Sequence, residues 1–366
     1  MIKKYKYLFC MNIFISVLPY YFISILLLKY MGLSYTTIGV LSVITEICGT
    51  VFDIPMSYIS QKIGYKKILI ISNFLLILGL ACLIFSNIKF VILSSVFIGL
   101  AESLYSGVGN SYNYEIINDD LEYESFLKHN NGIKYLFVAF VTIISPYLLK
   151  LNYVYPLFVS IFFCLLSLVC LYKLPEVSIL NSSKNMECPS FKRNLKKLPW
   201  DLIVVGVSFS TLIMVCNSYS SVLLNKSGVP LEFIGFALFL FNISMSLGSY
   251  LKINFSYTLL LPLIPLIISC LSNYYTMIIL FILMRMINAN YNNHFYTRFN
   301  KKIENNRAIA WSIYNFLISI SFIFTDLFSG IIADLFGLYI IYRIYALITI
   351  TVLMILFIVK RIVKKI

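Results

Sequence analysis

The sequence predicts an all-α membrane protein of twelve transmembrane helices, arranged as two pseudo-symmetric six-helix bundles. Composition is the first reason, because 60% of the 366 residues are hydrophobic and only 12% are charged, against about 45–50% and about 25% in soluble domains. An internal repeat is the second reason. The segment GLSYTTIG at 32–39 is matched by GVPLEFIG at 228–235, and NDDLE at 118–122 by NKKIE at 300–304. Duplicated helical halves are typical of proteins that move solutes across a bilayer.

Twelve apolar runs approach the roughly 20 residues that a spanning helix needs. The first is expected to remain as helix 1, because it shows no small-residue cleavage site of a signal peptide. The ninth is short and contains Pro262 and Pro265. The runs lie at about 8–28, 36–59, 67–86, 89–113, 131–149, 154–172, 200–222, 232–251, 256–271, 274–296, 308–332 and 338–359.

The polar, basic stretch 173–199 separates six runs from six. We therefore predict an N-terminal bundle at 1–172, a cytoplasmic linker at 173–199 and a C-terminal bundle at 200–366. Most of the 29 Lys and Arg residues fall in the loops on the side of the N-terminus. This bias predicts a multi-pass protein of the cell (plasma or inner) membrane with both termini in the cytoplasm. It also accounts for the net charge of +14 without a nucleic-acid partner.

Polar side chains are concentrated in every third helix of each half. Helices 1, 4, 7 and 10 carry many Ser, Asn and Tyr residues, whereas helices 6 and 12 are almost wholly apolar. Because polar groups avoid hydrocarbon, helices 1, 4, 7 and 10 are expected to line a central path. The alternative for any one of these side chains is an ordinary hydrogen bond between helices. The candidates for solute contacts are Tyr20, Tyr105, Asn110, Asn217, Asn288 and Tyr291.

The loop between the second and third runs carries a family motif. Many members of the major facilitator superfamily have G-x-x-x-D-[RK]-x-G-[RK]-[RK] there, and this chain resembles them with Ser57, Gln61, Lys62, Gly64, Lys66 and Lys67 in the corresponding stretch. Asp53 and Pro55 upstream, and the segment from Gly330 to Gly337, are also similar to the family. The resemblance implies the twelve-helix fold of these transporters and a gating role for the loop. Gln61 replaces the family's Asp, which implies a weaker latch or one carried by Asp53.

Five ionisable residues fall within the predicted spans, where each costs about 2.5–3.5 kcal/mol at a helix centre. Glu102 and Arg285 lie at nearly equivalent depths on helices 4 and 10, so we expect them to form a substrate or proton-coupling site. Their alternative is a structural ion pair between bundles. Glu46 shares one face of helix 2 with Asp53. Asp326 on helix 11 is interpreted equally as a site residue or as a gate contact.

These features predict a secondary active transporter that works by alternating access. Proton-coupled efflux of amphipathic organic compounds is the leading hypothesis, and uptake of a sugar, peptide or other metabolite is the alternative. A non-transporting sensor or scaffold is a remote third. No G-x-x-x-x-G-K-[ST] motif or catalytic constellation is present, so we expect neither ATP use nor an enzyme. The eight Cys and two His show no metal-ligand spacing. The expected partners are a small-molecule substrate, protons and the lipid bilayer, with no cofactor and a monomeric state.

Overall fold

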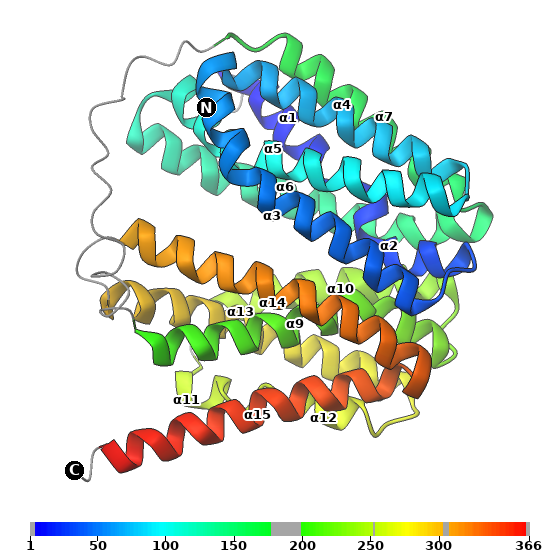
Figure 1. Cartoon of the computed structure of the whole chain (residues 1–366), viewed down its shortest axis with the longest axis vertical. Coiled ribbons are helices and arrows are strands. Elements are labelled where there is room, and N and C mark those ends of the chain that lie inside the picture. The colour runs from blue at the N-terminus through cyan, green and yellow to red at the C-terminus, as the bar shows by residue number, and fades with distance from the viewer. Residues whose placement is uncertain (1–3, 177–198, 252, 303–306, 364–366) are drawn as a thin grey trace. The chain divides into compact units, whose positions relative to one another are not determined.

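A computed structural model describes residues 4–176, 199–251, 253–302 and 307–363. Within these ranges the chain forms helices and no strands, as the composition predicts. The helices are shown in Figure 1 and are, in chain order, α1 (Lys6–Ser16), α2 (Pro19–Tyr30), α3 (Tyr35–Ile63), α4 (Tyr65–Ile84), α5 (Ile88–Ile117), α6 (Asp120–Leu151), α7 (Val154–Tyr172), α9 (Trp200–Lys226), α10 (Leu231–Tyr250), α11 (Phe255–Thr258), α12 (Leu263–Ile268), α13 (Tyr274–Lys302), α14 (Arg307–Phe336) and α15 (Leu338–Val363).

Each of the twelve predicted runs coincides with one helix or with a broken pair of helices. In the described part of the chain, nine segments are long and apolar enough to cross a membrane, with α1 and α2 counted together. Two further apolar segments, Leu136–Leu151 of α6 and Phe255–Ile268, are shorter. The helix α13 has 29 residues but carries many polar side chains. The all-α membrane fold is confirmed, while the count of twelve spans depends on these three segments. Most of the predicted linker lies at 177–198, outside the described residues.

The first predicted span is broken in its middle. The helix α1 ends at Ser16, Leu18 adopts an extended conformation, and α2 restarts with Pro19 at its first position. Proline suits this position because it has no backbone N–H to donate and its φ is already close to helical. The break therefore follows directly from the sequence. At Pro19 the backbone lacks an N–H donor near the middle of the span.

The ninth predicted span is broken as well. Its first turn, α11, begins at Asn254, whose side chain accepts a hydrogen bond from the Ser256 N–H at 3.3 Å. The segment then passes through Pro262 into the six-residue α12, which contains Pro265. Together with α10, which has 20 residues against 29 in α3, this short segment makes the stretch between the two repeated motifs shorter in the second half (228 to 300) than in the first (32 to 118).

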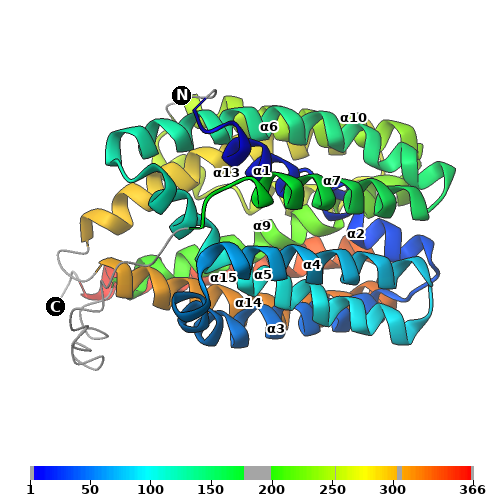
Figure 2. The same ribbon diagram turned by 90° about the horizontal axis from the view of Figure 1, so that it is seen from above.

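The described chain forms two compact units. One contains the described residues of 1–33, 40–184 and 231–239, and the other contains those of 34–39, 185–230 and 240–366. Each unit thus includes a short segment from the other half of the sequence, namely the first turn of α3 or the first two turns of α10. In the first unit α4 and α5 run side by side (Figures 1 and 2) and are joined by the Ser72 Oγ, which donates to the Ala101 carbonyl at 2.7 Å.

The repeated motif has the same role in both copies. Gly32 and Gly228, its first residues, adopt φ angles of 86° and 94° in the turns before α3 and α10. Backbone in this left-handed region strongly favours glycine. The copies therefore mark the same helix-to-helix turn in each half. The boundaries predicted for the two bundles and the linker remain a prediction.

Candidate functional site

A pocket of about 270 Å³ surrounds Glu102 in the first unit. Glu102 lies near the midpoint of the 30-residue helix α5, and its side chain is accessible from this pocket. A carboxylate in the middle of an apolar helix therefore opens into a hollow rather than packing into the core. The pocket is lined by Ile15, Ser16, Tyr21, Ser72, Leu76, Ala101, Glu102 and Tyr105.

Two further oxygen-bearing side chains act on the Glu102 carboxylate. The Tyr21 hydroxyl lies within hydrogen-bonding reach of it, and the Glu46 carboxylate interacts with it electrostatically. Glu46 is close because α3 and α5 cross tightly at this level, where Gly99 faces the Thr45 carbonyl and the Thr45 Oγ1 donates to the Ser95 carbonyl at 3.3 Å. The structure thus brings Glu46 and Glu102, both predicted site residues, to one place.

The break between α1 and α2 supplies main-chain polar groups to the same pocket. Pro19 has no N–H for the Ile15 carbonyl, and the Tyr20 N–H donates to the Ser160 Oγ at 3.1 Å instead of to the Ser16 carbonyl. Ile15 and Ser16 both line the pocket. A broken helix at membrane depth is tolerated where it lines a polar cavity, and this one lines the Glu102 pocket.

A buried hydrogen-bond network holds α1 against α5 beside the pocket. The Asn12 Oδ1 accepts from the Tyr105 hydroxyl at 3.1 Å and from the Asn113 Nδ2 at 3.3 Å. In return, the Asn12 Nδ2 donates to the Asn113 Oδ1 at 3.1 Å. The network positions Tyr105 in the pocket wall. Predicted Tyr20 is half-buried one residue from Tyr21, and its ring lies 5.8 Å from that of Tyr21.

The sequence alone did not select Tyr21, Ser72, Ile15 and Ser16 as site residues. Pro19 was the available signal, because a proline in mid-span predicts a helix break and unpaired carbonyls four residues earlier. Asn110, which the sequence did select, lies on α5, but its side chain is outside the described part of the structure.

Arg285 is a charged residue near the middle of α13 in the second unit. It is the eleventh residue after the start of α13, while Glu102 is the fourteenth after the start of α5. Its guanidinium lies 6.0 Å from the ring centroid of Phe241, which packs in turn on Phe281. In the described residues its Nε has no hydrogen-bond partner, and no carboxylate pairs with it.

The other predicted residues of the second unit have no hydrogen bond or ion pair with Arg285 among the described residues. Tyr291 is buried in an aromatic stack, with its ring 4.3 Å from that of Phe209. Asn288 is buried on the same helix, and Asn217 of α9 is half-buried. Asp326 of α14 is 9% exposed and interacts electrostatically with Tyr219. Their roles as solute contacts or gates remain predictions.

Part of the predicted gating loop lies outside the description. Nothing can be said of the side chains of Asp53, Pro55, Ser57, Gln61 and Lys62, which belong to the segment 53–62 of α3. The rest of the motif joins α4 to the end of α7. Gly64 forms the turn with a φ of 103°. The Lys66 ammonium donates to the Tyr172 and Leu174 carbonyls at 3.0 and 2.6 Å, and Lys67 pairs with Glu176 at 3.6 Å. Cations are favoured at a helix C-terminus in this way.

An ion pair outside the predicted spans ties the N-terminus to α6. The Lys4 ammonium and the Tyr5 hydroxyl both donate to Glu122, at 2.7 and 2.6 Å. These hydrogen bonds, that from Lys4 first, hold the pKa of the Glu122 carboxyl below its ordinary value. The same contact raises the pKa of Lys4. In the described residues no cluster of His, Cys, Asp and Glu could hold a metal ion.

A helical membrane fold with an accessible carboxylate at mid-helix is typical of polytopic transporters. A family sequence model described as Major Facilitator Superfamily matches residues 7–256. The chain therefore belongs to the major facilitator superfamily and is a secondary transporter, as the loop motif and the repeat predict. A comparison with curated protein sequences finds no match.

Solved structures extend the likeness to the whole fold. The nucleoside transporter NupG superposes with a TM-score of 0.72 at 11% identity, covering 98% of each chain. A bacterial homologue of the human lysosomal transporter Spinster, in an inward-facing and occupied conformation, gives 0.71 at 12% identity over 97% of this chain and 95% of that chain. A POT family transporter in complex with 5-aminolevulinic acid gives 0.71 at 13% identity over 97% and 96%. These TM-scores establish the shared fold, whereas identities this low do not determine which solute the chain transports.

Proposed function

We propose that the protein is a proton-coupled transporter of amphipathic organic compounds that works by alternating access in the cell membrane. The observation that carries the proposal is the Glu102 pocket. Its carboxylate faces a pocket at mid-helix and interacts with the Tyr21 hydroxyl and the Glu46 carboxylate. A coupling proton needs an accessible carboxylate at this depth, because such a group can bind and release a proton. Protonation also removes the free-energy cost of holding a charge within the membrane. No catalytic step is part of the proposal.

The chemistry of the pocket favours solutes with a positive charge or hydrogen-bond donors next to an apolar body. The Glu102 carboxylate and two tyrosine hydroxyls supply acceptors, and the Glu46 carboxylate adds negative charge nearby, while Ile15, Leu76 and Ala101 supply apolar surface. A proton and a cationic solute would compete for Glu102. Such competition couples the two fluxes in opposite directions and supports export by proton antiport. Uptake of a metabolite is the alternative outcome of the transport test below.

Arg285 of the second unit is a further candidate for the transport mechanism. A guanidinium without a carboxylate partner in the described residues is held at a similar distance along α13 as Glu102 is along α5. A charged residue within a span is costly, which supports a functional role for Arg285. In that role its guanidinium would bind an acceptor group of the solute, or a carboxylate in one state of the transport cycle. The excess of cations in the predicted inner loops supports placing both termini in the cytoplasm. We expect the monomer to be the transporting unit.

The test is transport in proteoliposomes with and without an imposed pH gradient. The compound panel should contain ethidium and tetraphenylphosphonium as amphipathic cations, and neutral and anionic compounds of similar size. We expect cation movement against the proton flux in the wild type and loss of this coupling in Glu102→Gln. Glu115→Gln is the matched control, because Glu115 is an exposed carboxylate near the end of the same helix. Transport that ignores the pH gradient equally in wild type and Glu102→Gln would refute proton coupling.

A further inference from the structure

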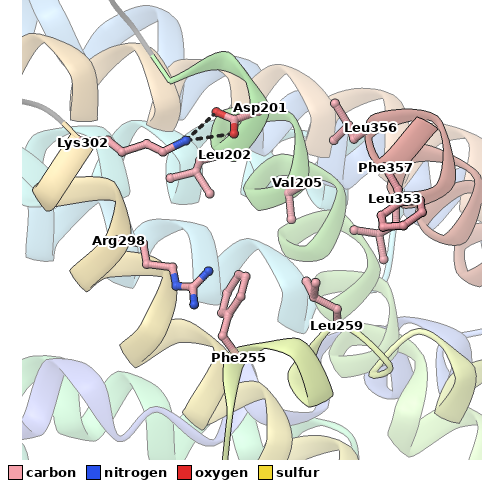
Figure 3. A pocket seen from close by; sticks show the side chains of 10 residues that line it. All are labelled: Asp201, Leu202, Val205, Phe255, Leu259, Arg298, Lys302, Leu353, Leu356 and Phe357. Atoms are coloured by element: carbon pink, nitrogen blue, oxygen red, sulfur yellow. Dashed lines mark hydrogen bonds and ion pairs between the residues drawn. The ribbon is translucent and has the colours of Figure 1, made fainter. Parts of the chain in front are cut away.

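A second pocket, of about 530 Å³, lies in the second unit between α9, α11, α13 and α15 (Figure 3). It is larger than the Glu102 pocket and shares no residue with it. Its wall combines two cations, Arg298 and Lys302, with aliphatic and aromatic side chains such as Leu353 and Phe357. The broken ninth span is what leaves this space, because only Phe255 and Leu259 of that segment reach the wall.

The charged residues of this pocket lie at the end of the membrane-spanning segments. Asp201 is the second residue of the candidate span Trp200–Lys226, and Phe357 is the second-to-last residue of the span Leu338–Ile358. The Lys302 ammonium bonds to the two carboxylate oxygens of Asp201 at 3.2 and 2.9 Å. The charged rim of the pocket therefore lies at the first turn of α9 and the last turn of α13, where we expect lipid headgroups.

The pocket retains one positive charge. Lys302 and Asp201 offset each other, whereas Arg298 is exposed and pairs with no carboxylate in the described residues. Its guanidinium lies 3.9 Å from the ring centroid of Phe255, which is itself 7% exposed. This cation–π contact fixes the guanidinium plane and leaves its N–H donors for an anion. Guanidinium is well suited to phosphate, which it can bind through two parallel hydrogen bonds.

The apolar side of the pocket opens towards the bilayer. Leu353 and Leu356 of α15 are half-buried, and Phe357 beside them is 70% exposed within a membrane-spanning segment. Acyl chains therefore lie next to the opening at high local concentration. A ligand with a phosphate for Arg298 and a hydrocarbon chain for α15 matches both sides, and basic pockets between transmembrane helices are known to bind lipid headgroups.

We propose that this pocket binds an anionic phospholipid, with its phosphate on Arg298 and an acyl chain along Leu353, Leu356 and Phe357. The inference is independent of the transported solute, because it concerns a separate pocket and is tested by lipid binding. The opposed charges of Asp201 and Lys302 form the rim of the site next to the phosphate.

The test is lipid retention by the purified full-length protein in detergent, measured by native mass spectrometry and by thermal unfolding. The probes are phosphatidylglycerol, phosphatidylcholine with the same acyl chains, and inorganic phosphate. We expect phosphatidylglycerol to be retained and to raise the unfolding temperature, with at least a fivefold loss of binding in Arg298→Gln. Arg343→Gln is the matched control, because this exposed arginine on α15 does not line the pocket.

Three outcomes would overturn the proposal. Equal retention of phosphatidylcholine would show that the charge of Arg298 selects nothing, and equal protection by inorganic phosphate would show that the acyl chain is not bound. Unchanged phosphatidylglycerol binding in Arg298→Gln would place the lipid elsewhere. If Arg298→Gln unfolds, Leu356→Ser tests the acyl side, and phosphatidylglycerol retention equal to that of the wild type would overturn the proposal in the same way.

Discussion

Gly39 and Gly235 occupy the same position in the two copies of the repeated motif, and each lies against the main chain of a helix from the other half of the sequence. A Cβ atom on Gly39 would meet the Asp326 carbonyl oxygen of α14 at 2.5 Å, and one on Gly235 would overlap the Ile143 carbonyl oxygen of α6. Main chain cannot move aside as a flexible side chain can. The last glycine of each motif therefore sets the closest approach of one helix pair in each unit.

We expect Gly39→Val and Gly235→Val to reduce both thermal stability and transport strongly. The added atoms would force α3 away from α14, or α10 away from α6, and lose the packing of the first helical turn. Overpacking of this kind costs about 1–3 kcal/mol. Unfolding temperature in detergent and transport in proteoliposomes are the measurements. Gly49→Ala is the control on α3, because its Cβ would meet nothing closer than 3.9 Å. A stable, active Gly39→Val protein would contradict this assignment.

Asp334 is expected to stabilise the start of α3. Its two carboxylate oxygens accept the Tyr35 and Thr36 N–H groups at 3.0 and 2.6 Å. Amides in the first turn of a helix have no partners within the helix, and losing a cap costs about 0.5–2 kcal/mol. Asp334→Ala should lower the unfolding temperature clearly. Asp334→Asn, which keeps one acceptor oxygen, should lie between Ala and wild type. Equal stability of all three proteins would rule out the cap.

Arg285→Met should make the protein more stable and less active. A guanidinium that has an unpartnered Nε and rests on Phe241 carries a desolvation cost that methionine removes while it fills a similar volume. Replacing a residue that serves function commonly raises stability and lowers activity in this way. The measurements are unfolding temperature and transport rate, and Arg343→Met is the comparison at an exposed position. A less stable Arg285→Met protein would instead assign Arg285 a structural role.

Tyr105→Phe is expected to weaken solute binding without unfolding the chain. The change removes the hydroxyl that donates to the Asn12 Oδ1 at 3.1 Å and positions the pocket wall. A hydrogen bond of this kind contributes about 0.5–1.5 kcal/mol to holding the tyrosine in place, so we expect KM to rise by at most about tenfold. Transport at several solute concentrations gives KM and kcat separately. The control is Tyr153→Phe, whose hydroxyl donates to the Ile84 carbonyl away from the pocket; a similar KM rise there would argue against a specific role for Tyr105.

The contact between Lys4 and Glu122 should make stability depend on pH at the acidic end. Because the pKa of Glu122 is lowered in the folded protein, its contribution is present at neutral pH and is lost as the pH falls through that lowered pKa. Lys4 remains charged throughout, since its pKa is raised above 10.5. The unfolding temperature of Glu122→Gln should therefore lie below that of the wild type at pH 7 and converge with it towards pH 3. A gap that stays constant over this range would contradict the ion pair.

Helix positions could be predicted from the sequence because each span is a local run of apolar residues. Pro262 and Pro265 likewise indicated a weak ninth span, which the structure divides into α11 and α12. The pairing of Glu46 with Glu102 could not be predicted, since it depends on the close crossing of α3 and α5 at Gly99. The role of Tyr21 depends in turn on the break at Pro19, which changes the direction of the side chains that follow it. Composition identifies polar helices, whereas three-dimensional packing decides which of their side chains meet.

The bond between Asp334 and Tyr35 joins positions 299 residues apart. A ribosome that has just finished α3 must still translate nearly all of the remaining message before the capping carboxylate exists. During that interval the nascent segment has to enter the membrane with its first amides bound to water or to lipid headgroups. This helix end can therefore close only after α14 has been translated, and a chain that stops before Asp334 would leave these two amides without their carboxylate.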